Sequence, residues 1–365
     1  MDYQMPLIAL AAGGTGGHIF PAEALARELL GRGCRVVLIT DKRGAKFGDD
    51  LPVPVYRVRA SAMGAGVIGK ARSILEMGIG VLQSRFWLGK LRPDVVVGFG
   101  GYPSIPTLYA AAHMGIPIVL HEQNAVLGRA NRAMLAKAKT VATSFPQLKG
   151  VGSNIGAKLV YTGNPVRPAF MSHRATPYPI PEGGVFRILV MGGSLGARVF
   201  STVVPQALAL LPEHLRRRIV IAQQCRKEDM ESAKLAFAAA GVDVEVSPFF
   251  RDVPERMASA HLLMCRAGGS TIAELTVIGR PAILVPYPHG HAGEQMVNAE
   301  SVAEAGGAWI IPEHAFTPEA LAVRLESLIV LPSALTKTAA AARAWGKPAA
   351  VDNLADCVIA SVVSK

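Results

Sequence analysis

The sequence predicts an α/β protein made of two Rossmann-like, doubly wound parallel-sheet domains that face each other across a cleft. The first indication is an apolar run at residues 7–10, followed by a glycine-rich turn at 11–18 and by a segment, 22–30, with apolar residues at helical spacing. The second indication is the same order of strand, glycine turn and helix at residues 187–198. Two such units half a chain apart predict two domains, and a ligand is expected in the cleft between them.

The first glycine turn, Gly13-Gly-Thr-Gly-Gly-His18, contains four glycines. Such a run is costly unless the backbone needs unusual dihedrals or must approach another group closely. At the start of a helix it presents unpaired N–H groups to an anion, and Pro21 fits just inside that helix. The turn lacks both the Gly-x-Gly-x-x-Gly of dinucleotide folds and the Gly-Lys-Ser/Thr of a Walker A loop. It is therefore either an anion site of another kind or a plain strand-to-helix turn.

Composition limits the class of protein. A chain of 365 residues is long for one hydrophobic core, which again predicts two domains. No apolar run reaches membrane-spanning length, and the N-terminus lacks the layout of a signal peptide. The four cysteines are scattered without a Cys-x-x-Cys pair, which fits a reducing cytoplasm. The net charge of +11 favours a phosphorylated ligand or an acidic membrane surface over nucleic acid, because no nucleic-acid-binding motif is present.

Further strands are predicted where short apolar runs recur. These runs lie at residues 35–40, 53–58, 93–97, 116–120, 141–144, 219–222, 244–246 and 262–265. The proline-rich stretch at 164–181 is typical of a connection between domains.

One predicted strand, 116–120, ends in four consecutive polar residues, His121-Glu-Gln-Asn124. Ligands of open α/β sheets bind at the carboxyl ends of the strands. One or two of these side chains can cap the next helix, but four are hard to explain by packing alone. We therefore predict chemistry at this strand end.

Residues 61–90 combine large apolar side chains with four basic residues and a single acid, Glu76. Two interpretations are open: a core helix, or an interfacial patch whose apolar side chains enter the lipid boundary while Lys and Arg meet anionic headgroups. The residues that would enter the lipid are Ile74, Leu75, Phe86 and Trp87.

A metal site is not expected. His289, His291 and Glu294 are candidate ligands, but they lack a constrained spacing such as His-x-x-x-His. The chain also has no Asp-x-Asp of the kind that holds a divalent cation on a nucleotide sugar.

Six motifs occur in the same order as in a known family of bacterial enzymes. They are Gly13-Gly-Thr-Gly-Gly-His18, His121-Glu-Gln-Asn124, Gly163-Asn-Pro-Val-Arg167, Gly192-Gly-Ser-Leu-Gly-Ala-Arg198, Arg266-Ala-Gly-Gly-Ser-Thr-Ile-Ala-Glu274 and Gln295-x-x-Asn298. The six motifs span nearly the whole chain. In their residues and their order the sequence resembles the MurG transferases of glycosyltransferase family 28. The loop at 288–293 departs from the forms of that family.

The resemblance implies a GT-B fold with an acceptor-binding, membrane-associating domain at 1–165 and a UDP-GlcNAc-binding domain at 166–345. The last helix, within 346–365, would return to the first domain. The implied reaction belongs to peptidoglycan biosynthesis. In it, the C4 hydroxyl of the MurNAc sugar of lipid I attacks C1 of UDP-GlcNAc with inversion, giving lipid II and UDP.

The implied setting is the membrane. The acceptor is an undecaprenyl diphosphate, so the enzyme would act as a peripheral protein at the cytoplasmic face of the bacterial inner membrane. That setting favours the interfacial interpretation of residues 61–90. The resemblance implies no cofactor, and it raises proteins of cell-wall synthesis and division as further partners.

Donor contacts are also implied. Glu274 should accept hydrogen bonds from the ribose hydroxyls, and Gln295 and Asn298 should hold the GlcNAc hydroxyls. Phe250 should meet the uracil through its backbone, and Ser194 should contact the diphosphate, whose charge helix N-termini can stabilise without a metal. The remaining implied donor contacts are Thr15, Gly16, Gly17, Asn124, Arg167, Gly269, Ser270, Thr271, Ile272 and Ala273.

The acceptor hydroxyl needs a base within hydrogen-bond reach. His18 is the first candidate because imidazole side chains titrate near neutral pH. The alternative is that His18 only hydrogen-bonds the acceptor diphosphate. Glu122 is the second candidate for the base and His121 the third.

Three other functions are open from the sequence. A GT-B enzyme acting on another lipid acceptor, such as diacylglycerol, would differ mainly in the N-terminal motifs. A non-catalytic nucleotide-sugar-binding subunit is disfavoured because both halves of the cleft lie in one chain. An NAD-dependent oxidoreductase is disfavoured because the first glycine turn does not match the Gly-x-Gly-x-x-Gly pattern. Asp41 is the only acid after that turn suited to binding the ribose of the dinucleotide.

Overall fold

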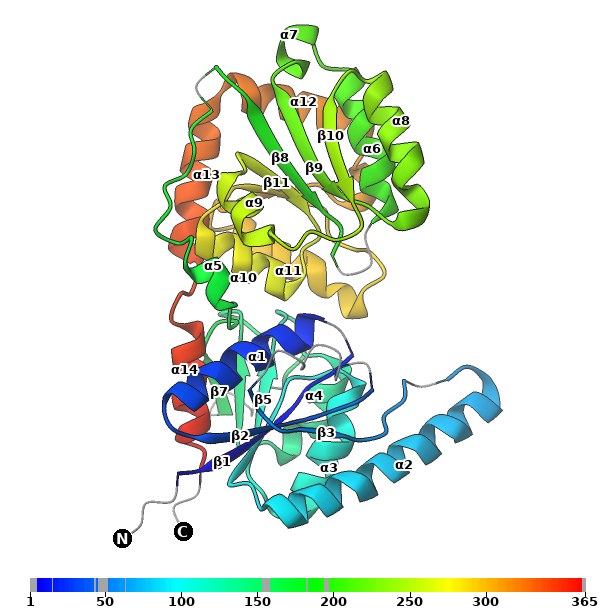
Figure 1. The fold of residues 1–365 in the computed structure, drawn as a ribbon, viewed down its shortest axis with the longest axis vertical. Helices are drawn as coiled ribbons and strands as arrows, with labels where there is room; N and C mark the ends of the chain where they lie inside the picture. The colour runs from blue at the N-terminus through cyan, green and yellow to red at the C-terminus, as the bar shows by residue number, and fades with distance from the viewer. Residues whose placement is uncertain are drawn as a thin grey trace. The chain divides into compact units, whose positions relative to one another are not determined.

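The computed structural model describes residues 5–14, 16–42, 44, 52–62, 64–152, 158–181, 183–193 and 197–362. The chain forms two compact units, each with its own parallel sheet (Figure 1). The first unit comprises Met1–Arg167 and Pro348–Lys365, and the second comprises Pro168–Lys347.

Within the described residues, the first unit has a seven-stranded parallel sheet in the order β3-β2-β1-β4-β5-β6-β7. The strands are β1 Leu7–Ala11, β2 Arg35–Thr40, β3 Val55–Arg57, β4 Val95–Gly98, β5 Ile118–Glu122, β6 Thr140–Thr143 and β7 Leu159–Tyr161. The helices are α1 Gly16–Gly31, α2 Gly66–Leu91, α3 Ile105–His113, α4 Arg129–Met134 and α14 Ala350–Ile359, with 3-10 turns η2 Tyr102–Ser104 and η3 Leu135–Lys137.

The order of the strands reverses beside β1, which pairs with β2 on one edge and with β4 on the other. In open α/β sheets the loops leaving the strands at such a switch point diverge and form a ligand crevice. The two predicted catalytic residues lie at this edge of the sheet: His18 follows β1, and Glu122 is the last residue of β5.

Helices cover both faces of this sheet, so its central strands are apolar on both sides. Ile8 and Leu10 of β1 pack with Leu25 and Leu29 of α1 on one face. The alternating residues of the same strand pack on the other face with Leu108 of α3.

The C-terminal helix α14 belongs to the first unit, although the whole second unit, Pro168–Lys347, lies between it and β7 in the sequence. It lies beside α1 (Figure 1), and its Leu354, Ala355 and Val358 are fully buried in the same core cluster as residues of α1. Arg32, just after α1, pairs with Asp352 and Asp356 of α14.

Within the described residues, the second unit has a six-stranded parallel sheet in the order β10-β9-β8-β11-β12-β13. The strands are β8 Phe186–Met191, β9 Ile219–Gln224, β10 Asp243–Ser247, β11 Leu262–Cys265, β12 Ala282–Leu284 and β13 Ala308–Ile310. The helices are α5 Pro168–Met171, α6 Arg198–Ala209, α7 Glu213–Arg216, α8 Met230–Ala239, α9 Val253–Ser259, α10 Gly269–Ile278, α11 Glu294–Ala303, α12 Pro318–Val330 and α13 Pro332–Trp345, with 3-10 turns η5 Lys227–Asp229, η6 His291–Gly293 and η7 Glu313–Ala315.

This sheet repeats the plan of the first. The strand order reverses beside β8, which pairs with β9 and β11. Phe186, Ile188 and Val190 of β8 form a core with Phe200 of α6 and Leu321 of α12. The predicted α/β class with two doubly wound parallel sheets is confirmed.

Among the helices of the described residues, none combines the length and the apolar character needed to cross a bilayer.

Candidate active site

The glycine turn after β1 is required by close packing. A Cβ on Gly13 would lie 2.8 Å from Cβ of Pro103 and 2.9 Å from Oδ1 of Asp41, and Gly14 has a φ of +89°. Asp41 in turn accepts a hydrogen bond from the Gly44 N–H at 2.9 Å. Part of the glycine content is therefore explained by the fold of the turn itself.

A second glycine turn, after β4, lies against the first predicted catalytic residue. Gly101 has a φ of +69°, and a Cβ on it would lie 3.1 Å from Cδ2 and 3.3 Å from Nε2 of His18. His18, in the first turn of α1, is partly exposed. The absent side chain of Gly101 thus leaves room for the imidazole.

The other edge of the His18 ring contacts the end of β5. Nδ1 of His18 lies 3.2 Å from Oε1 of Gln123, and Nε2 of Gln123 lies 3.0 Å from Nδ1 of His121. The same Nε2 donates to the carbonyl oxygen of Phe99 at 2.9 Å. A continuous hydrogen-bonded chain therefore leads from the partly exposed His18 to the buried end of β5.

His121 is fully buried at the inner end of this chain. Its Nε2 lies 3.4 Å from the Gly163 carbonyl and 3.3 Å from the Ser144 hydroxyl. Burial lowers the pKa of His121 to about 4, and the nearby His18 adds to the effect. His121 is therefore neutral at physiological pH, and it has no surface for contact with a substrate.

Glu122 is also buried, and its carboxylate is engaged within the unit. It accepts hydrogen bonds from the N–H of Asn124 at 3.1 Å, the N–H of Gly128 at 2.9 Å and the Nδ2 of Asn131 at 2.9 Å. These contacts hold the turn that leads into α4, a structural role typical of a buried carboxylate.

Arg167, at the end of the first unit, stacks on the face of Phe20 of α1, with the guanidinium carbon 4.3 Å from the ring centroid. Gly16 allows this ring to lie close, because a Cβ on it would be 2.7 Å from Cε2 of Phe20. Gly17 is exposed beside it, and Asn124 follows β5. Thr15 lies outside the described residues.

In the second unit, two amides of α11 hold the turn before α10. Oε1 of Gln295 accepts from the N–H of Ala267 at 3.1 Å and from the N–H of Tyr287 at 3.0 Å. Nδ2 of Asn298 donates to the Ala267 carbonyl at 3.0 Å. Both polar groups of Ala267 are thus bound by side chains one helical turn apart.

Gln295 and Asn298 differ in how much of their side chains is exposed. Asn298 is completely buried, whereas Gln295 is half-buried and its Oε1 is engaged by two backbone donors. Gln295 therefore has its NH₂ group to offer a ligand. Asn298, in contrast, supports the turn from inside.

The first turn of α10 carries most of the other predicted donor contacts. The N-cap of this helix is Gly268, which has no side chain to cap it. Gly269, Ile272, Ala273 and Glu274 are buried, and Ser270 and Thr271 are half-buried. The N–H groups at such a helix start face outward and favour an anion.

Arg266 holds the neighbouring loop. Its guanidinium donates to the carbonyl of Val285 at 3.0 Å, pairs with Glu313, and lies 5.4 Å from the ring centroid of Tyr287.

Phe250, predicted to contact uracil, is buried under the guanidinium of Arg256, whose central carbon lies 4.2 Å from the ring centroid. Ser194 lies outside the described residues.

The predicted membrane residues divide between two sides of α2. Ile74, Leu75 and Phe86 are exposed. Trp87 is half-buried and packs on Tyr56, with the ring centroids 4.5 Å apart. Trp87 therefore belongs to the packed side of the helix, while the other three face outward.

No group of three or more His, Cys, Asp or Glu side chains with a metal-binding arrangement occurs among the described residues. The ring of His289 packs edge-on against Tyr287, with centroids 5.6 Å apart.

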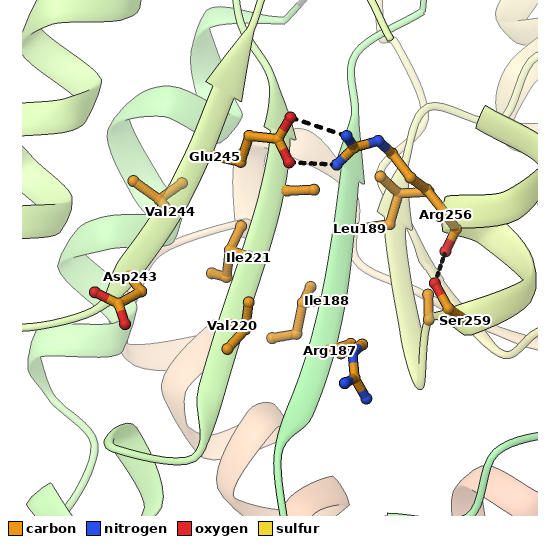
Figure 2. A pocket seen from close by; sticks show the side chains of 12 residues that line it. Arg187, Ile188, Leu189, Val220, Ile221, Asp243, Val244, Glu245, Arg256 and Ser259 are labelled. Carbon is orange, nitrogen blue, oxygen red and sulfur yellow. Dashed lines mark hydrogen bonds and ion pairs between the residues drawn. The ribbon is translucent and has the colours of Figure 1, made fainter. Parts of the chain in front are cut away.

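A pocket of about 490 Å³ lies elsewhere in the second unit (Figure 2). It is formed by the amino-terminal halves of β8, β9 and β10 and by α9, with an ion pair between Glu245 and Arg256 at 2.6 Å on its border. The predicted donor residues follow the carboxyl ends of the strands, so this pocket includes none of them.

Sequence reasoning missed two residues that the structure joins to His18. Gln123 stood within the predicted polar cluster but received no role, and Gly101 was not among the candidates. The signal for both was present, since Gly101 follows β4, which borders the switch point, and Gln123 follows β5, the next strand of the sheet.

Two Rossmann-like parallel sheets in one chain give it the GT-B fold. The chain belongs to glycosyltransferase family 28. The family's N-terminal domain matches residues 8–143, and its C-terminal domain matches residues 187–354.

Relatives cover nearly the whole chain. A UDP-N-acetylglucosamine--N-acetylmuramyl-(pentapeptide) pyrophosphoryl-undecaprenol N-acetylglucosamine transferase of Rhodospirillum centenum is 57% identical, over 97% of this chain and 94% of its own. The protein of the same name from Brucella suis biovar 1 is 48% identical over 98% of this chain and 95% of its own. The crystal structure of Acinetobacter baumannii MurG matches with a TM-score of 0.79 and 29% identity, covering 97% of this chain and 99% of the other.

Proposed function

We propose that this protein transfers GlcNAc from UDP-GlcNAc to the C4 hydroxyl of the MurNAc sugar of lipid I, with inversion, giving lipid II and UDP. The observation that carries the proposal is the 57% identity, along 97% of the chain, to a transferase named for this donor and acceptor. The geometry of each unit supports a role in this reaction.

In the first unit, His18 is the proposed base. It is partly exposed at the switch point of the sheet, and its Nδ1 is engaged by Gln123, so Nε2 is the ring nitrogen available to a substrate hydroxyl. A base at that position takes the C4 proton as the oxygen attacks C1 of the donor. Glu122 suits this task less well, because three donors surround its buried carboxylate.

In the second unit, α10 and α11 are the proposed donor site. The N–H groups at the start of α10 would stabilise the charge that develops on the UDP diphosphate as it leaves. Glu274, one turn further on, would accept from the ribose hydroxyls. The NH₂ of Gln295 would donate to a GlcNAc hydroxyl, and Asn298 would act by holding the Ala267 turn.

Several predicted contacts complete the proposal. Thr15 and Ser194 are proposed to contact the diphosphate from the two glycine turns, and Phe250 to contact the uracil through its backbone. The remaining proposed donor contacts are Gly16, Gly17, Asn124, Arg167, Gly269, Ser270, Thr271, Ile272 and Ala273. We expect the reaction to proceed without a metal or a cofactor.

The proposed location is the cytoplasmic face of the inner membrane, and the outer face of α2 supports it. Ile68, Leu75, Leu82 and Phe86 are exposed and stand seven, seven and four residues apart, which places them on one stripe of the helix. Ser73, Gly80, Ser84 and Leu88 face the protein instead. Three of these four buried residues are small, whereas the residues of the exposed stripe are large and apolar, which is unusual for a core helix.

Basic residues flank this stripe on α2. Lys70, Arg72, Arg85 and Lys90 are all exposed. An apolar stripe bordered by Lys and Arg is suited to the surface of an anionic bilayer. A lipid acceptor would be reached from that surface.

The second candidate function keeps the donor and changes the acceptor to another lipid, such as diacylglycerol. UDP release from UDP-GlcNAc distinguishes the two, measured with a lipid I analogue and with diacylglycerol vesicles, each with and without EDTA. The proposal expects release that depends on the lipid I analogue, that survives EDTA, and that is far slower with UDP-GalNAc. Release with diacylglycerol alone would instead support the alternative.

A further inference from the structure

We propose that Gln123 is a positioning residue that sets the tautomer of His18, so that Nε2 carries the lone pair offered to the acceptor hydroxyl. This inference rests on the proposed role of His18 as the base. It gives a function to a side chain that none of the predicted substrate contacts uses.

The orientation of the Gln123 amide is fixed by a carbonyl that can only accept. Its Nε2 lies 2.9 Å from the carbonyl oxygen of Phe99. The opposite orientation would bring two oxygens to that distance and leave the amide N–H groups without this acceptor. The NH₂ group must therefore face Phe99, and Oε1 must face His18.

The tautomer of His18 follows from this orientation. Oε1 of Gln123 accepts hydrogen bonds and cannot donate them, so the Nδ1 of His18, at 3.2 Å, must carry the proton. In a neutral imidazole the other nitrogen is then unprotonated. That atom, Nε2, lies on the ring edge that faces Gly101.

His121 fixes the second N–H of the same amide. The Gln123 NH₂ lies 3.0 Å from Nδ1 of His121, so that nitrogen accepts, and Nε2 carries the proton beside the Gly163 carbonyl at 3.4 Å and the Ser144 hydroxyl at 3.3 Å. A protonated His121 would point an N–H at that NH₂ group. Burial keeps His121 neutral, because its pKa is lowered to about 4.

Phe99, His121 and Gln123 are shielded from solvent, so water cannot take the place of their hydrogen-bond partners. Phe99 and His121 have no exposed surface, and Gln123 is 3% exposed. Buried polar groups keep their partners because an unmade hydrogen bond is costly there. Backbone carbonyls at the buried end thus determine the direction of every hydrogen bond out to His18.

The kinetic test is a double-mutant cycle with UDP-GlcNAc and a lipid I analogue. Gln123→Met should lower kcat by about tenfold to a hundredfold with little change in KM, because the base is presented in the wrong tautomer part of the time. In a His18→Ala background the same change should have no further effect on kcat. Equal loss in both backgrounds would overturn the proposal.

A matched variant separates the role of Gln123 from the general effect of losing a buried amide. Gln223→Met is the matched control, because Gln223 is a buried glutamine of the second unit that donates to Ser201 at 3.0 Å, and its replacement should leave kcat unchanged. A Gln223→Met variant as slow as Gln123→Met would contradict the proposal.

A spectroscopic test needs neither catalysis nor a variant of Gln123. The chain has nine histidines, and nitrogen NMR of histidine-labelled protein reports which ring nitrogen of each is protonated. The signals lost in His18→Ala identify His18, and the proposal expects its Nδ1–H form. An Nε2–H form would overturn the inference even if transfer is observed. Conversely, an Nδ1–H form in a protein without transferase activity would count against the proposed function alone.

Discussion

At the residue scale, the molecule uses amide side chains to fix backbone and imidazole groups beside the predicted sites. Gln123 joins β4, β5 and the start of α1 through Phe99, His121 and His18. Gln295 and Asn298 do the same for the turn before α10. An amide suits this task because it has a donor and an acceptor at fixed separation and carries no charge.

Gly101→Ala should lower kcat by about tenfold or more, because its Cβ would push the His18 ring away from its position. The same change strains a positive φ and should cost roughly 1–3 kcal/mol of stability. Gly115→Ala is the matched control, since Gly115 has a φ of +70° but nothing within 4 Å of the added carbon. Steady-state kinetics and urea unfolding check both variants. Equal kinetic losses in both would show that strain alone explains the effect.

Residue positions were easier to predict than residue roles. The glycine turns and the polar end of β5 could be found because they follow apolar runs in the sequence. The roles of Glu122, Gln123 and Asn298 depend on which atoms face which neighbours, across separations of up to 105 residues along the chain. Spacing within a motif contains no information about such contacts.

At the element scale, α2 shows why periodicity alone cannot assign a helix face. A stripe of apolar residues normally marks the buried side. In α2 the buried side instead consists mostly of small residues, with Leu88 near its end: the Ser84 hydroxyl lies 3.2 Å from the Thr107 hydroxyl of α3, and a Cβ on Gly80 would overlap the Arg59 carbonyl. The helices α2 and α3 pack against each other (Figure 1), and the apolar stripe of α2 remains exposed.

Replacing Leu75, Leu82 and Phe86 together by Ser should weaken binding to anionic vesicles by at least about tenfold, since each side chain loses its transfer free energy. Turnover of a water-soluble acceptor analogue should be unchanged. Trp87 is left intact because it packs on Tyr56. Leu235→Ser, at an exposed leucine of α8 in the second unit, is the control. Vesicle flotation at low and high salt measures the binding, and loss of soluble turnover would indicate a packing role for the stripe.

The C-terminal helix makes a second prediction at this scale. Leu354→Ala should destabilise the first unit by about 2–5 kcal/mol, because Leu354 is fully buried against α1. Leu82→Ala, an exposed leucine of the same unit, should change stability by less than about 0.5 kcal/mol. Urea unfolding followed by Trp87 fluorescence, in a Trp309→Phe/Trp345→Phe background, reports on this unit. An unchanged midpoint for Leu354→Ala would contradict the assignment of α14 to its core.

At the scale of the whole molecule, the chain contains two sheets of the same plan, and the proposed function assigns the acceptor to the first unit and the donor to the second. In each sheet the strand order reverses beside the strand that leads into a glycine turn, β1 in the first unit and β8 in the second. This repeated plan was predictable because the order of strand, glycine turn and helix occurs twice in the sequence. The joining of α14 to the first unit followed only from the family resemblance, because an amphipathic helix does not specify its partner.

Acid should destabilise the first unit through His121. Its folded pKa of about 4 lies below the value of 6.5 for an unperturbed histidine, so the unfolded chain binds a proton first as the pH falls. The unfolding free energy should therefore be unaffected by this group above about pH 6.5 and fall by about 2 kcal/mol between about pH 6.5 and about pH 5. Urea unfolding followed by Trp87 fluorescence measures this slope. His121→Gln should reduce it, whereas His113→Gln, at an exposed histidine, should not.

The measurement that tests the central claim most directly is analysis of the product formed from UDP-GlcNAc and a lipid I analogue. The account predicts one UDP released for each acceptor consumed, and a disaccharide in which GlcNAc is joined through a β linkage to the C4 oxygen of MurNAc. UDP release without glycosylated acceptor, or an α-linked product, would contradict it.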